Sequence, residues 1–178
     1  RVMTRLGLSS ARIFSVNTLN EVVRAQPNTT LATALEVPLN SIVNATMNVR
    51  AMDHYAFTAK QGQRVIVDCA TRGIDSKLDA VVVIADAAGR DLLVERRGDV
   101  LDFNVPQDGK YIVKVHELTF KGGSEQFYRL GIWEQPAGTP IVRQATTHPV
   151  HAFSWPPTGL PQQAQLTEAE PNNEAAQV

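Results

Sequence analysis

The chain has 178 residues, which is enough for one well-packed core with some length left for connecting segments. Its hydrophobic fraction of 43% and charged fraction of 20% are ordinary for a globular domain, and its net charge of −1 gives no electrostatic case for nucleic acid or an anionic membrane as a partner. No apolar run reaches about 18 residues, so the sequence predicts no membrane span.

Cys69 is the single cysteine, which excludes a disulfide framework and a cluster of thiolate metal ligands within the chain. It shares the strand parity of Val65 and Val67. We therefore predict a small buried hydrophobe at this position rather than a reactive thiol.

The predicted elements are almost all strands. A strand is predicted over residues 10–16, and residues 1–23 are assigned to the end of a preceding domain or to an N-terminal strand. A short helical turn is predicted over 31–35. From Ile42 onward, apolar residues recur with a period close to two, which is typical of β-strands. Strands are predicted over residues 42–48, 54–59, 64–70, 80–84, 91–95, 100–105, 111–116 and 128–132.

Polar, glycine-bearing turns separate these strands, at residues 61–63, 86–90, 106–109 and 121–124. No helix of three turns is predicted. This pattern of about eight short strands predicts an all-β fold, an antiparallel β-sandwich.

Five aromatic side chains fall on the inward parity of the predicted strands, which assigns them to the core and leaves few for stacking on a ligand. They are Tyr55, Phe57, Phe103, Tyr111 and Tyr128. Trp133 follows the final predicted strand and is expected to cap the end of the sandwich.

Residues 135–167 are rich in proline, a composition that favours an extended spacer. We assign them to a linker and expect the linker to pack on the sandwich or on a neighbouring copy. Five apolar side chains would anchor it: Ile141, Val142, Val150, Phe153 and Trp155.

A short phrase occurs twice in the chain. Gln26-Pro27-Asn28-Thr29-Thr30 precedes the β-type sequence, and Glu170-Pro171-Asn172-Asn173-Glu174 follows it. We interpret the phrase as the opening of a module that is used once and then begun again at residues 168–178. The chain is therefore expected to be part of a modular polypeptide rather than a free-standing enzyme.

The region from about residue 26 to residue 133 resembles the bacterial pre-peptidase C-terminal domain, and the resemblance rests on several phrases that occur in the family's order. These phrases are Pro27-Asn28-Thr29-Thr30, Asp53-His54-Tyr55-Ala56-Phe57-Thr58-Ala59, Lys60-Gln61-Gly62-Gln63, Leu78-Asp79, Asp86-Ala87-Ala88-Gly89, Pro106-Gln107-Asp108-Gly109-Lys110-Tyr111 and Tyr128-Arg129-Leu130.

The resemblance implies a jelly-roll-like β-sandwich over residues 24–134. Members occur beside secreted peptidases, as collagen-binding modules in bacterial collagenases, and repeatedly in large surface proteins. A secreted, periplasmic or cell-surface location is therefore expected.

Calcium is bound in some members by acidic and asparagine residues of the opening segment, and the resemblance leaves Asn28 and Asp53 as its ligands here. The glutamates that the family usually carries before Pro-Asn are replaced by Arg24 or Ala25 and by Gln26. This removes negative charge, so we expect no calcium or other cofactor. The alternative roles are a turn cap for Asn28 and a backbone N–H acceptor for Asp53.

The remaining polar residues give no catalytic pattern. His148 and His151 would need two further ligands to hold zinc. His54 and His116 lie on the solvent parity of strands. Asp75 and Asp79 fall in a loop, and neither a nucleophile elbow nor a phosphate-binding glycine loop occurs. No catalytic residue is assigned.

The sequence therefore predicts a non-catalytic accessory module that spaces or presents neighbouring domains of the same polypeptide. Two alternatives stay open. One is a module that binds carbohydrate or a collagen-like protein, with an extracellular polysaccharide or protein as its partner. The other is self-association through the C-terminal segment.

Overall fold

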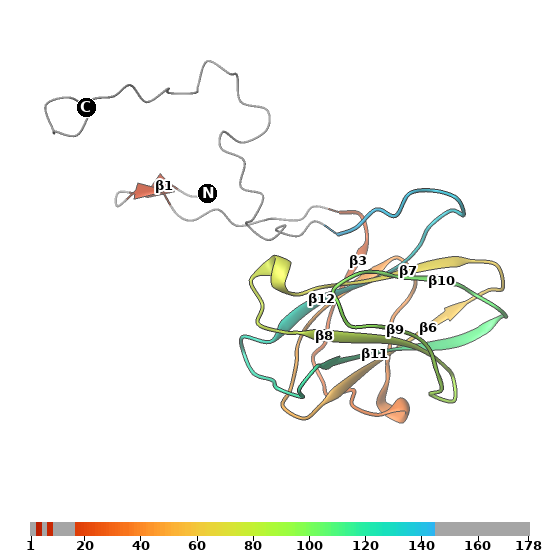
Figure 1. Cartoon of the computed structure of the whole chain (residues 1–178), viewed down its shortest axis with the longest axis horizontal. Helices are drawn as coiled ribbons and strands as arrows, with labels where there is room; N and C mark the ends of the chain where they lie inside the picture. Colours follow the sequence, from red (N-terminus) through yellow and green to blue (C-terminus); the bar gives the residue numbers. More distant parts are fainter. Residues whose placement is uncertain (1–2, 5–6, 9–16, 145–178) are drawn as a thin grey trace, which may run out of the picture. The chain divides into compact units, whose positions relative to one another are not determined.

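The structure is a computed structural model that describes residues 3–4, 7–8 and 17–144 (Figure 1). Near the N-terminus, β1 (Met3–Thr4) and β2 (Gly7–Leu8) form an antiparallel pair. The predicted strand over 10–16 lies outside the described residues, as do the linker beyond residue 144 and the second phrase at 168–178. No helix of the described residues is long and apolar enough to cross a membrane.

Residues 20–134 form two five-stranded sheets that pack face to face, which confirms the predicted all-β sandwich (Figure 1). The first sheet has the order β10 (Leu101–Asn104), β7 (Arg64–Ala70), β12 (Phe127–Glu134), β5 (Ser41–Thr46), β3 (Asn20–Val23). The second sheet has the order β4 (Leu35–Glu36), β6 (Met52–Ala59), β11 (Gly109–Glu117), β8 (Ala80–Asp86), β9 (Asp91–Glu95).

The chain moves between the two sheets after nearly every strand, so most neighbours within a sheet are distant in sequence. The sandwich has ten strands rather than about eight, because β3 and β4 were not predicted. These two strands are also the exception to the antiparallel prediction: β3 pairs with β5, and β4 with β6, in parallel. The predicted helical turn is a single 3₁₀ turn, Leu31–Thr33.

The core lies between the sheets and is built by the alternation of each strand. The five aromatic side chains predicted to be internal are all buried there. Phe57 stacks on Tyr111 with ring centroids 5.7 Å apart, and Phe103 meets Tyr111 edge-on at 5.1 Å. Cys69 is half-buried and packs against this core, and burial raises the pKa of its thiol.

The outer face of the second sheet is partly covered by the opening segment, which we define as residues 24–34. Ala34 packs against a small buried cluster of Ala56, Ala85 and Ile112. His54, on the same face of β6, is only 7% exposed. His54 therefore lies on the outer face that its parity indicates, but the opening segment covers it there.

The outer face of the first sheet is covered by a closing segment, residues 135–144. Arg64 donates to the carbonyls of Pro136 (3.1 Å) and Thr139 (2.8 Å). Ile66 points outward by alternation and yet is fully buried. Trp133 lies within β12 rather than beyond it, which corrects its predicted role as an end cap.

The closing segment is held mainly by polar side chains. Of the predicted apolar anchors, Ile141 is half-buried and Val142 is 72% exposed, and Val150, Phe153 and Trp155 lie outside the described residues.

Candidate functional site

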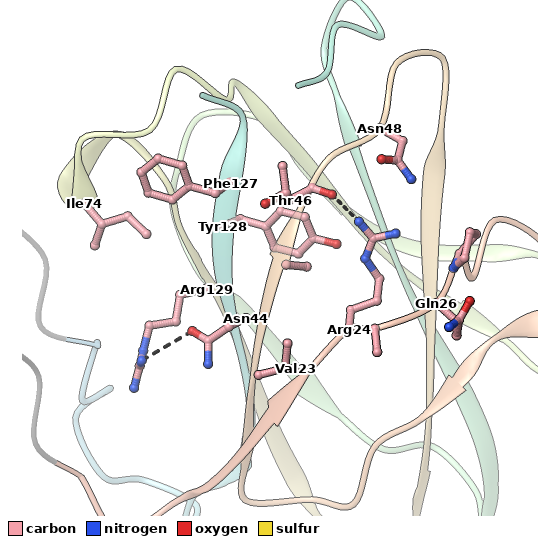
Figure 2. Close-up of a pocket in the computed structure, with 13 residues that line it drawn as sticks. Val23, Arg24, Gln26, Asn44, Thr46, Asn48, Ile74, Phe127, Tyr128 and Arg129 are labelled. Atoms are coloured by element: carbon pink, nitrogen blue, oxygen red, sulfur yellow. Dashed lines mark hydrogen bonds between the residues drawn. The ribbon is translucent and has the colours of Figure 1, made fainter. Parts of the chain in front are cut away.

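A groove of about 760 Å³ runs along the end of β3, the opening segment and the neighbouring ends of β5 and β12 (Figure 2). Its lining combines amides, two arginines and a few apolar side chains: Val23, Arg24, Ala25, Gln26, Pro27, Asn44, Ala45, Thr46, Asn48, Ile74, Phe127, Tyr128 and Arg129. Arg24 follows the end of β3, and Arg129 lies near the start of β12. Their side chains approach the groove from two sides (Figure 2).

Arg24 is almost fully buried and forms an ion pair with a buried carboxylate. Its side chain is 7% exposed, and its Nη1 lies 3.1 Å from Oδ1 of Asp53, which is completely buried. Its Nη2 donates to the carbonyl oxygen of Thr46 (Figure 2). The other oxygen of Asp53 accepts a 2.5 Å hydrogen bond from the Tyr128 hydroxyl, which in turn lies 2.5 Å from the hydroxyl of Tyr55.

The titration of this network reflects its burial. Burial raises the pKa of Asp53, and the hydrogen bond from Tyr128 and the charge of Arg24 oppose that rise without cancelling it. Burial likewise raises the pKa of both tyrosines. Both hydroxyls therefore remain neutral, and Tyr128 acts as a hydrogen-bond donor to the carboxylate.

Arg129 forms a second, more exposed network on the same groove. Its Nη2 pairs with Oε1 of Glu21, and its Nη1 donates to Oδ1 of Asn44 at 3.4 Å. Asn44 also donates to Glu21 Oε2 at 2.6 Å. Burial raises the pKa of Glu21, but hydrogen bonds from Asn44 and Asn17 and the charge of Arg129 bring it below its ordinary value.

The two predicted calcium ligands belong to neighbouring segments, and both already make other contacts. Asn28 is 2% exposed, and its amide donates to the carbonyl oxygen of His54, the residue after Asp53, at 2.7 Å. Both oxygens of Asp53 already accept hydrogen bonds, from Arg24 and Tyr128. Calcium requires about six to eight oxygen ligands, and the Arg24 guanidinium already engages one oxygen of Asp53.

The structure also differs from the predicted alternative roles, a turn cap for Asn28 and a backbone N–H acceptor for Asp53. Asp53 accepts bonds from side chains rather than from backbone N–H groups. Asn28 ties the opening segment to β6, with the His54 N–H donating back to the Asn28 carbonyl at 2.9 Å.

The other polar residues singled out in the sequence have structural partners. His116 stacks on Phe120, with ring centroids 4.8 Å apart and nearly parallel planes. Asp79 forms an ion pair with Arg72. His148 and His151 lie outside the described residues. Within residues 3–4, 7–8 and 17–144, no group of three histidine, cysteine or acidic side chains could hold a metal ion.

Besides the Arg24–Asp53 pair, three further polar contacts were not predicted from the sequence. They are the Arg129–Glu21–Asn44 network, the contacts of Gln144 with Asp68, and those of Arg143 with the loop after β9. The sequence did carry a signal for the contact of Gln144: Gly131 is a glycine inside an otherwise apolar strand. Such a glycine often marks the close approach of another segment. A Cβ at Gly131 would lie 2.6 Å from the side-chain amide nitrogen of Gln144.

No protein-family model matches the sequence, and no curated protein matches it. Among solved structures, the chain is similar to the pre-peptidase C-terminal domain of a collagenase from Bacillus anthracis, with 15% identity, coverage of 56% of this chain and 93% of that one, and a TM-score of 0.46. That domain is of the family that the sequence motifs indicate.

The chain is also similar to PliG from Aeromonas hydrophila, a periplasmic inhibitor of g-type lysozyme, with 15% identity, coverage of 65% of this chain and 99% of that one, and a TM-score of 0.46. PliG from Salmonella Typhimurium gives 17% identity, coverage of 57% and 99%, and a TM-score of 0.38.

Proposed function

We propose that this sandwich is a non-catalytic accessory module of a larger secreted, periplasmic or cell-surface bacterial protein, and that it spaces or presents the neighbouring domains. The observation that carries the proposal is the way in which the chain enters and leaves the sandwich. Both connections are fixed to the same sheet by hydrogen bonds and ion pairs.

The incoming connection is β3, which is held along its length. Its first residue, Asn20, donates to the Asn40 carbonyl at 3.0 Å, and Arg24 just after the strand donates from its backbone to Asn44 at 3.1 Å. Between them, Glu21 is paired with Arg129 of β12. The strand therefore cannot swing away from the sheet without breaking both backbone and side-chain contacts.

The outgoing connection is the closing segment, which folds back over β12 and β7. The backbone N–H of Gln144 donates to Asp68 Oδ2 at 3.0 Å, and its side chain donates to the Asp68 carbonyl at 2.9 Å. Arg143 donates to the Gly98 carbonyl at 2.8 Å. Asp68 is 1% exposed, so this anchor is buried beneath the segment that it holds.

Both connections are held by a single row of paired residues that runs across the first sheet. In that row Glu21 pairs with Ile42, Ile42 with Gly131, and Gly131 with Asp68. Glu21 belongs to the incoming strand, and Asp68 anchors the outgoing segment. One sheet thus sets the positions of both connections, which is what a spacer needs in order to restrict the relative motion of its neighbours.

Distance measurements between spin labels test this proposal. In the full chain with Cys69→Ser, labels at Thr18 and Val142 report the two connections, and labels at Thr58 and Val94 report the second sheet as a control. We expect equally narrow distance distributions for the two pairs. A broad distribution for the first pair beside a narrow one for the control would contradict the proposal.

Binding of an extracellular polysaccharide or protein is the second candidate, and the groove favours it. The exposed amides of Gln26 and Asn48 and the half-buried ring of Phe127 line it together. Titration with soluble glycans and with a collagen-like peptide tests this candidate. Saturable binding that is lost in an Asn48→Ala, Phe127→Ala variant with an unchanged unfolding midpoint would support it, and no binding would exclude those ligands.

A further inference from the structure

We infer that Arg24 is a built-in cation that takes the place of a bound divalent ion at this end of the sandwich, so that the module keeps its fold without calcium. The inference rests on three observations: the oxygens around the Arg24 guanidinium, the burial of Asp53, and the difference between the two copies of the opening phrase.

Oxygen atoms from two separate parts of the chain contact the Arg24 guanidinium. They belong to the Asp53 carboxylate on β6 and to the Thr46 carbonyl at the end of β5. The side-chain oxygen of Asn28 is also buried in this region and has no hydrogen-bond partner among the described residues. Carboxylate, carbonyl and amide oxygens are the ligand types that calcium uses.

A positive charge at this place stabilises the buried carboxylate of Asp53. Asp53 is completely buried on the inner face of β6, and a buried carboxylate is costly unless it is paired. Tyr128 supplies a hydrogen bond to one oxygen but no charge. Arg24 supplies the charge, and its side chain is itself 7% exposed, so the pair is shielded from solvent.

The second copy of the opening phrase is acidic where the first copy is basic or neutral. When the two are aligned on Pro-Asn, Arg24 corresponds to Glu168 and Gln26 to Glu170. The structure places residue 24 against Asp53 and residue 26 on the same groove. A glutamate at position 24 would bring a second carboxylate to Asp53, and one at position 26 would add negative charge to the same groove, which would favour a bound cation.

The inference predicts how calcium affects folding in the native chain and in a variant with reversed charge. The unfolding midpoint of the native chain should be the same in millimolar calcium chloride and in EDTA. Arg24→Glu with Gln26→Glu should lower the midpoint in EDTA by roughly 10 °C or more, because three carboxylates then repel one another. Calcium should restore most of that loss.

Two control variants separate this effect from a simple loss of packing. Arg24→Lys keeps the charge and should retain most of the stability without responding to calcium. Arg24→Met keeps an apolar stem, leaves Asp53 unpaired and should be destabilised, and calcium should restore little because too few ligands remain. Magnesium should restore the double variant less than calcium, since it demands a more rigid octahedral site.

Three results would overturn the inference. The first is a fall in the midpoint of the native chain when EDTA is added. The second is a double variant that is as stable as the native chain in EDTA. The third is a double variant that stays unfolded, or equally destabilised, whether or not calcium is present.

Discussion

Two arginines that line the groove each pair with a carboxylate, and the surroundings of the two pairs differ. Arg24 and Asp53 are 7% and 0% exposed, whereas Arg129 and Glu21 are 20% and 43% exposed. The first pair is largely withdrawn from water, so the loss of one partner leaves a poorly solvated, uncompensated charge. The second keeps access to solvent, which screens its charges. The comparison indicates that the contribution of an arginine to the stability of this fold depends on the burial of its ion pair and not on its charge alone.

The largest effect is expected when the buried pair is broken. Asp53→Ala leaves the Arg24 guanidinium and the Tyr128 hydroxyl without their acceptor, and the free energy of unfolding should fall by about 3–5 kcal/mol. Urea denaturation measures this. The Arg24→Met, Asp53→Ala double variant should lose less than the sum of the two single losses, because no buried charge is left unpaired. Additive losses would contradict the comparison.

A smaller effect is expected at Gly131, where the closing segment crosses β12. An alanine Cβ would lie 2.6 Å from both the Gln144 amide nitrogen and Cζ3 of Trp133. Because the Gln144 side chain can move and the tryptophan ring can shift, Gly131→Ala should cost about 1–3 kcal/mol. Gly109→Ala is the matched control, since its Cβ would meet nothing within 4 Å. Equal costs at the two glycines would show that the crossing is not tight.

Breaking the exposed pair of Arg129 and Glu21 should change the stability of the fold only slightly. Arg129→Met should change the free energy of unfolding by no more than about 1 kcal/mol, because the pair with Glu21 is open to solvent. The same measurement at high salt should narrow the difference from the native chain further. A loss as large as that of Asp53→Ala would mean that the two pairs are equivalent and that burial does not separate them.

The smallest effect is expected from acid titration of Asp102, which pairs with Arg64 at 2.8 Å. The hydrogen bond from Arg64 lowers the pKa of Asp102 below its ordinary value. The carboxylate therefore stabilises the fold at neutral pH, and this contribution is lost as the pH falls through the lowered value. As the pH is lowered, the thermal unfolding midpoint should fall less steeply in Asp102→Asn than in the native chain. Identical slopes of midpoint against pH would contradict this prediction.

The sequence predicted the interior of the sandwich well, because alternation is a local pattern. The bounds of β7 and β9 match the prediction, and Tyr55, Phe57 and Tyr128 are internal as expected. β3 and β4 have only four and two residues and were missed, since so short a run carries little periodicity. Both are edge strands whose positions depend on partners far along the chain.

The outer faces could not be predicted from strand parity. His54 has solvent parity, but the opening segment covers it; Ile66 has the same parity, and the closing segment lies over its sheet. The position of Arg24 before Pro-Asn was visible in the sequence, but its partner Asp53 lies 29 residues away. Only the packing of β3 against β5 brings the guanidinium to that carboxylate.

Hydrogen exchange at two backbone amides tests most directly whether one sheet holds both connections. The Arg24 N–H donates to Asn44, and the Gln144 N–H donates to the buried carboxylate of Asp68. We predict that both amides exchange slowly, at rates comparable with those of β5 and β12, and that Asp68→Ala releases only the second. Exchange of the Gln144 amide at the rate of an open chain in the native protein would contradict the account.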